Sequence, residues 1–307
     1  MTLKEYARLV EDALERRLAA PDPADMTAPA VGEAPPLLLE AMRYSVMAGG
    51  KRLRPAMLLA CADMLGVDRD RAMPYACALE MIHTYSLIHD DLPGMDDDTL
   101  RRGRPTNHVV FGVGQAILAG DGLLNEAMET MAGAALAEPT PEGMRQGLGA
   151  LYEIAACAGI RGMIGGQCAD LYAEREKVAS GQMLGYIHAG KTARLLTAPL
   201  RAAARLAGCA EDSAEMQALT AFGEAFGLLF QAEDDILDVT GDAATLGKST
   251  GKDAASGKLT WVTLYGLDGA REHADALRDE AERSLAPLGD RAAFFYDLLR
   301  SLRGRRA

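Results

Sequence analysis

The chain has 307 residues, 49% of them hydrophobic and 25% charged, so it is a globular chain long enough for one large domain or two small ones. Its net charge of −12 argues against a nucleic-acid-binding surface. Charged residues interrupt its apolar segments before these reach the roughly 20 residues of a membrane helix, so we expect no stable membrane insertion.

The N-terminus and the cysteines carry no sign of secretion. Residues 1–18 predict an amphipathic, charged helix without the apolar core of a signal peptide. The cysteines are odd in number and scattered through stretches rich in Ala, Leu and Gly, as expected of core residues. They are Cys61, Cys77, Cys157, Cys168 and Cys209. We therefore expect a cytoplasmic protein without disulfides.

Helix formers dominate the chain, and aromatic residues make up only 5% of it. Apolar residues recur three and four positions apart, which predicts helices, and no sustained alternation indicates a sheet. The expected helices cover residues 37–48, 56–65, 75–88, 115–136, 144–159, 180–207, 214–237, 261–285 and 292–303. Proline-rich loops are expected at 21–36 and 138–141. With no evident linker or repeat, we expect a single all-α helical bundle, one domain over residues 1–307.

The segment 87–105 carries five aspartates within nine residues, followed directly by three arginines. Carboxylates this close raise one another's pKa, so keeping them ionised at pH 7 requires arginines or metal ions nearby. The apolar stretch 81–88 predicts a buried helix, which Pro93-Gly94 ends soon after Asp91. The first carboxylates are therefore expected at the mouth of a space lined by helices.

A second acidic cluster, QAEDDILD, occupies residues 231–238 after another apolar run. Asp234 and Asp238 stand four positions apart, so a helix puts both carboxylates on one face. Carboxylates at this spacing suit Mg²⁺, which takes one or two protein carboxylates together with waters and substrate phosphates. Two such clusters facing each other could hold a diphosphate through bridging magnesium ions.

The segment Gly49–Pro55, GGKRLRP, has two interpretations. Its glycines allow a ligand to approach the backbone closely, and Lys51 and Arg54 can converge on one anion. The same residues also suit the end of one helix and the start of the next. Beside two aspartate clusters, we favour the anion site.

Four motifs together resemble the short-chain trans-polyprenyl diphosphate synthases, and among these most the bacterial farnesyl diphosphate synthases. They are GGKRLRP at 49–55, DDxxxxD at Asp90, Asp91 and Asp96, RRGRPTNH at 101–108, and DDxxD at Asp234, Asp235 and Asp238. The likeness extends over residues 37–267. It implies an isoprenoid synthase-like bundle around a central cavity, aspartates that bind Mg²⁺ (three ions once substrate is bound), and a homodimer.

The resemblance also implies two substrates. In the family, isopentenyl diphosphate is bound without metal by the residues that match Lys51, Arg54, His83 and Arg102. The residue matching Arg101 contacts the allylic diphosphate and takes part in catalysis. Without the resemblance, His83 on its apolar helix would be taken for a core histidine.

Further residues are implied near the allylic substrate. Those matching Lys191, Thr192 and Gln231 are catalytic, and the oxygens of the threonine and the glutamine face the carbocation. Those matching Lys248 and Lys258 close over the diphosphate, although the sequence around them also suits a solvated loop.

One segment departs from the family pattern. After the lysine matching Lys258, the family continues with one residue and then Thr-Tyr-Pro, whereas this chain has Leu-Thr-Trp-Val-Thr at 259–263. We therefore expect the following helix to begin differently.

The implied product depends on Tyr85. Five residues of helix span roughly 7.5 Å, so the Tyr85 ring lies more than one turn below Asp90 and can act as a floor for the growing chain. Ser86 is small and blocks little. In the family, a bulky ring here and two extra residues between Asp91 and Asp96 accompany a C15 product. We expect farnesyl diphosphate; the alternative is geranylgeranyl diphosphate (C20), because neighbouring helices or a partner subunit could move the floor.

Two other classes of protein remain as alternatives. Residues 241–249 resemble the nucleotide-binding P-loop GxxxxGK[ST], but five residues instead of four separate Gly241 from Gly247, and an acidic cluster replaces the preceding strand. A class I terpene cyclase shares the bundle and the aspartates but binds one diphosphate, which leaves 49–55 unexplained. Release of diphosphate from paired C5 substrates, hydrolysis of a nucleotide, or hydrocarbon from one prenyl diphosphate would distinguish the three.

Overall fold

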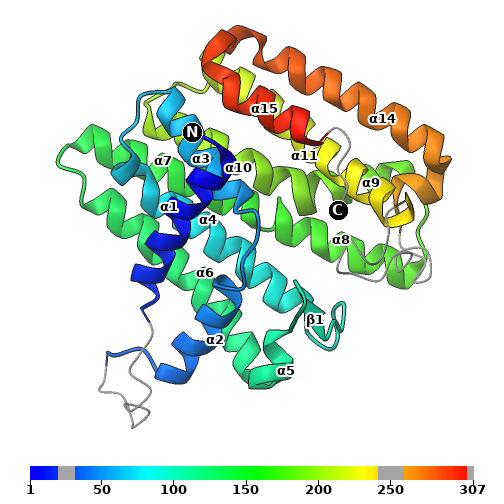
Figure 1. Cartoon of the computed structure of the whole chain (residues 1–307), viewed down its shortest axis with the longest axis horizontal. Helices are drawn as coiled ribbons and strands as arrows, with labels where there is room; N and C mark the ends of the chain where they lie inside the picture. Colours follow the sequence, from blue (N-terminus) through cyan, green and yellow to red (C-terminus); the bar gives the residue numbers. More distant parts are fainter. Residues whose placement is uncertain (20–31, 241–258, 303–307) are drawn as a thin grey trace. The chain divides into compact units, whose positions relative to one another are not determined.

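A computed structural model describes residues 1–19, 32–240 and 259–302. These residues are helical nearly throughout, with one two-stranded hairpin, which confirms the all-α class (Figure 1). They form two compact units. Unit 1 comprises Met1–Leu59 and Asp68–Leu148, and unit 2 comprises Ala60–Val67 and Gly149–Ala307. Helices α3 (Leu53–Met64) and α7 (Pro141–Ala158) run from one unit into the other, and a single domain over 1–307 stays a prediction.

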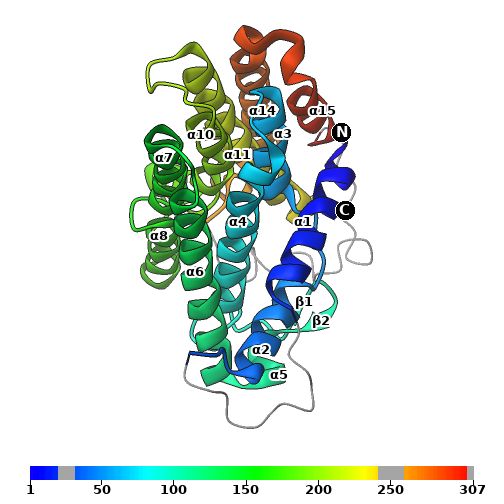
Figure 2. The same cartoon turned by 90° about the vertical axis from the view of Figure 1, so that its left-hand side faces the viewer.

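Unit 1 is built around α4 (Arg69–Asp90), which lies beside α6 (Val113–Leu136) (Figure 2). Helix α4 begins where the Asp68 carboxylate accepts a hydrogen bond from the Asp70 N–H. It has buried residues on every face, as expected of a central helix. Around it lie α1 (Leu3–Arg17), α2 (Pro36–Val46), the antiparallel strands β1 (Leu100–Arg101) and β2 (Arg104–Pro105), and α5 (Asn107–Phe111).

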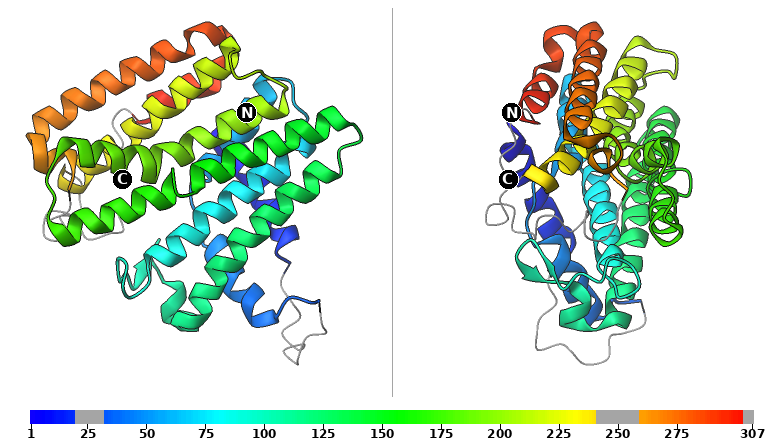
Figure 3. Two further views of the ribbon diagram at one scale, coloured as in Figure 1. Left: turned by 180° about the vertical axis from the view of Figure 1, so that it is seen from behind. Right: turned by 90° about the vertical axis from the view of Figure 1, so that its right-hand side faces the viewer.

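Unit 2 is built around α11 (Ala214–Thr240), which packs against α10 (Arg194–Leu206) and α14 (Trp261–Leu285) (Figure 3). Phe222 of α11 is fully buried, and its ring centroid lies 5.4 Å from those of both Phe226 and Phe295. The remaining elements are α8 (Met163–Glu176), α9 (Gly181–Ile187), the π-helix η2 (His188–Ala193), the 3₁₀ helix η3 (Ala286–Ala292) and α15 (Ala293–Leu302).

Three departures of the structure from the expected helices bear on the site. Helix α8 forms where no helix is predicted, because Gly165 and Gly166 weaken the helical pattern there. The helix expected over 180–207 is divided into α9, η2 and α10. The hairpin of β1 and β2 follows the first aspartate cluster, in a stretch too short to show alternation.

By length and composition, one helical stretch, Pro141–Glu176, could cross a membrane. A core helix of a soluble protein meets the same criteria, so one such stretch is weak evidence for a membrane span. Residues 159–162 also separate its two helices, α7 and α8.

Candidate functional site

The first aspartate motif lies at the C-terminal end of α4, in unit 1. Asp90 is the last residue of the helix, and the Asp96 N–H donates to the Asp90 carbonyl at 2.8 Å. The chain therefore folds back and brings the first and last aspartates of the motif together. Asp90 is half-buried and Asp96 is exposed. Since the C-terminal end of a helix carries partial negative charge, this position favours a bound cation.

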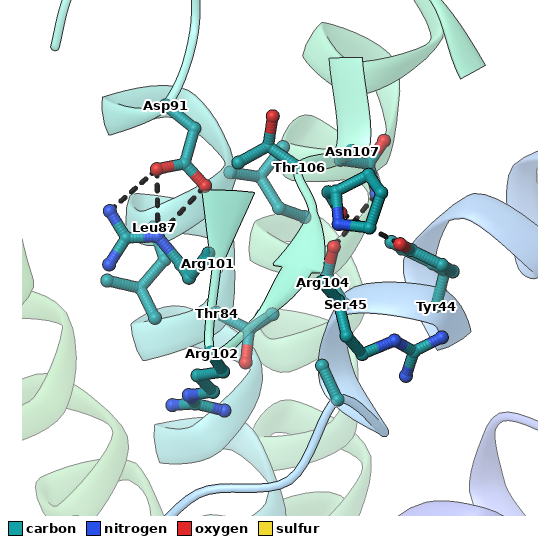
Figure 4. A pocket seen from close by; sticks show the side chains of 13 residues that line it. Tyr44, Ser45, Thr84, Leu87, Asp91, Arg101, Arg102, Arg104, Thr106 and Asn107 are labelled. Carbon is teal, nitrogen blue, oxygen red and sulfur yellow. Dashed lines mark hydrogen bonds and ion pairs between the residues drawn. The ribbon is translucent and has the colours of Figure 1, made fainter. Parts of the chain in front are cut away.

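Asp91 has a different environment, because it is buried and paired with Arg101 (Figure 4). Arg101 Nε donates to both carboxylate oxygens, at 2.8 and 2.9 Å, and Nη2 donates to Oδ1 at 2.6 Å. Burial raises the pKa of Asp91 in spite of the guanidinium. The structure thus joins two predicted site residues in one fixed, forked ion pair.

The hairpin that carries Arg101 is anchored on α2, around a pocket that α4 also lines (Figure 4). The Tyr44 hydroxyl donates to the Pro105 carbonyl at 2.8 Å. The Asn107 amide donates to the Ala41 carbonyl at 2.8 Å and to the Ser45 hydroxyl at 2.9 Å. The uncharged residues of the RRGRPTNH motif therefore hold its arginines in place.

The GGKRLRP loop and Arg102 come together around His83. Gly50 has a φ of 132°, which strains any other residue, and a Cβ on it would lie 2.7 Å from the guanidinium carbon of Arg102 and would displace that side chain. Arg102 also donates to the Gly49 carbonyl. The pKa of His83 lies well below its usual value, first because of burial and then because of Arg54 and Arg102. His83 is therefore neutral while the surrounding Arg54 and Arg102 are positively charged, and such a cluster can bind an anion.

In unit 2, Lys191 and Thr192 lie on η2, and π-helices of this kind are frequent at functional sites. Lys191 Nζ donates to Asp170 Oδ2 at 2.7 Å. The Thr192 hydroxyl donates to Gln231 Oε1 at 2.9 Å, so the threonine and the glutamine that were both predicted near the allylic substrate are in contact.

Asp235 of the second motif is buried and held by three elements. Gln231 Nε2 donates to Oδ1 at 3.0 Å, and the Trp261 backbone N–H donates to Oδ2 at 2.9 Å. His188 Nε2 lies 3.7 Å from Oδ2. Asp235 therefore links η2 and the start of α14 to α11. Asp234, by contrast, is exposed.

The altered segment before α14 forms a regular helix start. The Thr260 hydroxyl accepts from the Thr263 N–H at 3.1 Å, and the Thr260 N–H donates to the Thr263 hydroxyl at 2.8 Å. This capping box forms the entry of α14. Lys248, Lys258 and the P-loop-like stretch 241–249 lie outside the described residues.

The two motifs suit Mg²⁺ that keeps waters and phosphate oxygens. In the described part of the chain, no three His, Cys, Asp or Glu side chains gather to enclose a metal ion. Mg²⁺ needs only one or two carboxylates when a substrate supplies the rest. The residues that would hold it are Asp90 with Asp96, and Asp234 with Asp238, since Asp91 and Asp235 are buried in protein contacts.

Tyr85 and Ser86, the residues predicted to set the chain length, lie on α4. Tyr85 is 5% exposed, and its ring meets that of His89 edge to face, with centroids 5.8 Å apart. The Tyr85 hydroxyl is buried without a hydrogen-bond partner among the described residues, and burial raises its pKa to about 12. The Ser86 hydroxyl donates to the His83 carbonyl at 2.9 Å.

Sequence reasoning missed several residues of this arrangement. Asp170 lies on α8, which is not expected to be a helix. Arg52 belongs to the GGKRLRP motif but receives no predicted role, and its partner Glu80 receives none either. An acidic residue in an apolar helix is the one available signal for Glu80.

Comparison with known proteins gives consistent results. The family profile described as "Polyprenyl synthetase" matches residues 35–288. The chain is 47% identical over 254 residues to geranylgeranyl pyrophosphate synthase 9, chloroplastic, of Arabidopsis thaliana, covering 82% of this chain and 69% of that protein. It is 45% identical over 259 residues to the chloroplastic geranylgeranyl pyrophosphate synthase of Capsicum annuum, covering 84% and 69%. The structure of an FPP/GFPP synthase from Zymomonas mobilis matches with a TM-score of 0.82 and 32% identity over 97% of this chain and 96% of the other.

Proposed function

Because this chain belongs to the polyprenyl synthetase family, we propose that it joins an allylic diphosphate to isopentenyl diphosphate and releases diphosphate. One observation carries the proposal. In each aspartate motif one carboxylate, Asp91 or Asp235, is buried against protein groups, while the others remain accessible to a metal ion, and separate cationic groups lie nearby. A terpene cyclase or a nucleotide hydrolase does not require the cluster of Arg54, Arg102 and His83.

In unit 1, the proposed roles follow from charge. Arg54, Arg102 and Lys51 bind the diphosphate of isopentenyl diphosphate without metal. Arg101, fixed by Asp91, faces the allylic diphosphate. When bound at the reachable aspartates, Mg²⁺ would offset the negative charge that develops on the leaving diphosphate.

In unit 2, the proposed roles follow from the hydrogen bonds. Asp170 holds the Lys191 ammonium toward the leaving diphosphate. Thr192 donates to Gln231, and Gln231 donates to Asp235, so the hydroxyl and amide oxygens keep lone pairs that can face a carbocation. The proposed reaction requires that water, which would quench this cation, be excluded, and it requires no protein nucleophile.

For the product we favour geranylgeranyl diphosphate. The support is the identity of 44–47% to chloroplastic proteins named geranylgeranyl pyrophosphate synthases, each covering 80% or more of this chain. Farnesyl diphosphate is the second candidate, favoured by the buried Tyr85 ring more than one turn below Asp90.

Product analysis tests both candidates. The purified protein is incubated with dimethylallyl diphosphate and excess isopentenyl diphosphate with Mg²⁺, and products are separated by chromatography. A C20 product supports the first candidate. A C15 product from the wild type, together with C20 or longer products from Tyr85→Ala, supports the second. Absence of any prenyl product, with diphosphate not released, would refute the proposed function.

We also propose a homodimer that covers an apolar face of α5 and α6. Val109, Val113, Ile117 and Leu118 there are between 41% and 53% exposed. Leu118 also lines an apolar groove between α2 and α6. Light scattering should give twice the chain mass of 32.6 kDa for the wild type and one chain mass for Ile117→Glu.

The matched control for the dimer is Leu136→Glu, at the far end of the same helix, where the side chain is 70% exposed. This variant should keep the mass of the wild type. An Ile117→Glu variant that stays dimeric would show that α6 does not form the interface.

A further inference from the structure

Arg52 lies in the GGKRLRP loop, yet its side chain points into the protein. The residue is 2% exposed, whereas Lys51 beside it is exposed and Arg54 is half-buried. Its φ is 47°, in the left-handed region that residues other than glycine rarely adopt. Arg102, at the same cluster, has a φ of 53°. Strained residues of this kind persist only where their surroundings fix them, and they concentrate at ligand sites.

Three helices of unit 1 supply the groups that fix Arg52. Nη1 donates to Glu80 Oε1 on α4 at 2.6 Å. Nη2 donates to the Val46 carbonyl at the end of α2, also at 2.6 Å. Nε donates to Glu11 Oε1 on α1 at 3.2 Å. Each of the three guanidinium nitrogens therefore has an acceptor, and the side chain has no exposed surface.

Glu80 connects this anchor to the anion cluster. It is 2% exposed and lies three residues before His83 on α4, so both side chains belong to one face of the helix. The carboxylate therefore pairs with Arg52 on the buried side, while His83 lies beside Arg54 and Arg102. Helix α4 therefore both anchors the GGKRLRP loop, through Glu80, and supplies His83 to the cluster.

We infer that Arg52, paired with Glu80, is a positioning residue for isopentenyl diphosphate. The fixed backbone at residue 52 sets the directions of Lys51 and Arg54, which flank it in the chain. If residue 52 relaxed to an ordinary φ, the backbone would redirect these two side chains. The inference rests on the proposed function, in which they bind the diphosphate.

The role requires arginine in particular. Its planar fork reaches three acceptors in three directions, whereas a lysine ammonium is a single point that cannot span them. Arg52→Lys therefore keeps the charge but loses the geometry. Glu80→Gln keeps Arg52 and its contacts with Val46 and Glu11 but replaces the ion pair with a weaker hydrogen bond from the guanidinium to a neutral amide oxygen.

The test measures binding of isopentenyl diphosphate to the full chain by calorimetry in the presence of EDTA, and KM values for isopentenyl and geranyl diphosphate. Arg52→Lys should weaken the binding and raise the KM for isopentenyl diphosphate by about 10-fold, with the KM for geranyl diphosphate changed less than about 2-fold. Glu80→Gln should act in the same direction and less.

Arg71→Lys is the matched control. Arg71 is also in unit 1, where its Nε donates to Glu138 at 2.5 Å and its Nη2 to Gln146 at 2.8 Å, away from the GGKRLRP loop. This variant removes a comparable fork, so it reports the effect of a purely structural loss. It should change stability without changing either KM.

Several outcomes would overturn the inference. One is Arg52→Lys and Glu80→Gln variants that keep wild-type helix content and bind isopentenyl diphosphate as the wild type does. Another is an equal loss for both substrates. If Arg52→Lys does not fold, Glu80→Gln decides alone. A wild type that neither binds isopentenyl diphosphate nor turns over refutes the proposed function and this inference together, whereas normal binding in all variants refutes the inference alone.

Discussion

Adjacent aspartates in the two motifs have different environments and therefore different proposed roles. Asp91 and Asp235 are 3% and 4% exposed and accept hydrogen bonds from protein groups, whereas Asp90 is half-buried and Asp234 exposed. Successive side chains on a helix point about 100° apart, so one aspartate of each pair faces the protein when the other faces outward. The direct binding of Mg²⁺ by Asp91 and Asp235 stays a prediction, and the geometry favours a positioning role for both.

Substitution of neighbouring aspartates should separate these roles. Asp90→Asn should raise the Mg²⁺ concentration needed for half-maximal activity, because it removes a metal ligand. Asp91→Asn should leave that concentration within about 2-fold but lower kcat/KM for the allylic substrate by about 100-fold, because Arg101 loses its anchor. Titration of activity with Mg²⁺ measures both effects.

The control is Asp97→Asn. Asp97 is exposed and has a φ of 50°, which asparagine tolerates as well as aspartate does. It should change neither parameter. If Asp91→Asn shifts the Mg²⁺ requirement as much as Asp90→Asn does, then Asp91 is a ligand and its bond with Arg101 gives way to the metal.

Residue types and spacing, together with a family resemblance, were enough to predict that Thr192 and Gln231 lie near each other and that Arg54, His83 and Arg102 group together, but not the hydrogen bond between Thr192 and Gln231. The partners Glu80 and Asp170 could not be predicted, because each lies more than 20 positions along the chain from the cation it binds. Which buried charges meet across that separation depends on how the helices pack.

The π-helix η2 depends on a close contact with α8. A Cβ on Gly166 would lie 2.1 Å from the Lys191 backbone nitrogen and 2.7 Å from the Gly190 carbonyl carbon. These are backbone atoms, which cannot move aside as a side chain can. The sequence predicted one continuous helix here, because the wider π turn is set by this packing and leaves no periodic signal.

Gly166→Ala should therefore displace η2 from α8. We expect a loss of about 1 to 3 kcal/mol in the free energy of unfolding, as for other overpacked contacts, and a fall in kcat because Lys191 and Thr192 move. Urea unfolding and steady-state kinetics measure the two effects.

Gly185→Ala is the control for this substitution. Gly185 is on α9, and a Cβ there would have no neighbour within 4 Å. Alanine should stabilise that helix by about 0.5 to 1 kcal/mol without changing kcat. If Gly166→Ala is as harmless as Gly185→Ala, the close contact does not determine the position of η2.

At the scale of the whole chain, apolar periodicity predicted the all-α class and most of the helices. It failed at α8 and at the hairpin, where glycines or short length hide the pattern. The division of the described residues into two units was not visible either, because α3 and α7 cross it without any break in composition.

Stability of the whole chain should fall below the ordinary pKa of histidine. The pKa of His83 is lowered by burial and then by nearby guanidiniums, and that of His273, stacked on Trp261 with ring centroids 3.8 Å apart, is lowered by burial. Above about pH 6.5 both residues are neutral in the folded and unfolded chains, so they contribute no pH dependence. Below it the unfolded chain takes up protons that the folded chain resists, and unfolding is favoured.

The expected slope is at most about 1.4 kcal/mol per pH unit for each such histidine. Glu5 and Glu211 have lowered carboxyl pKa values, so they stabilise the folded chain above pH 4.5 and lose this contribution only as the pH falls below that value. The free energy of unfolding in urea, measured at pH 7.5, 6.5 and 5.5, should therefore fall between pH 6.5 and pH 5.5, and the fall should be smaller in His83→Gln.

Added inorganic diphosphate should also reduce the fall in the wild type, because an anion beside Arg54 and Arg102 offsets the charge that opposes protonation of His83. A His83→Gln variant with the slope of the wild type would show that His83 takes up a proton as readily in the folded chain as in the unfolded one, which would contradict a cationic cluster around it.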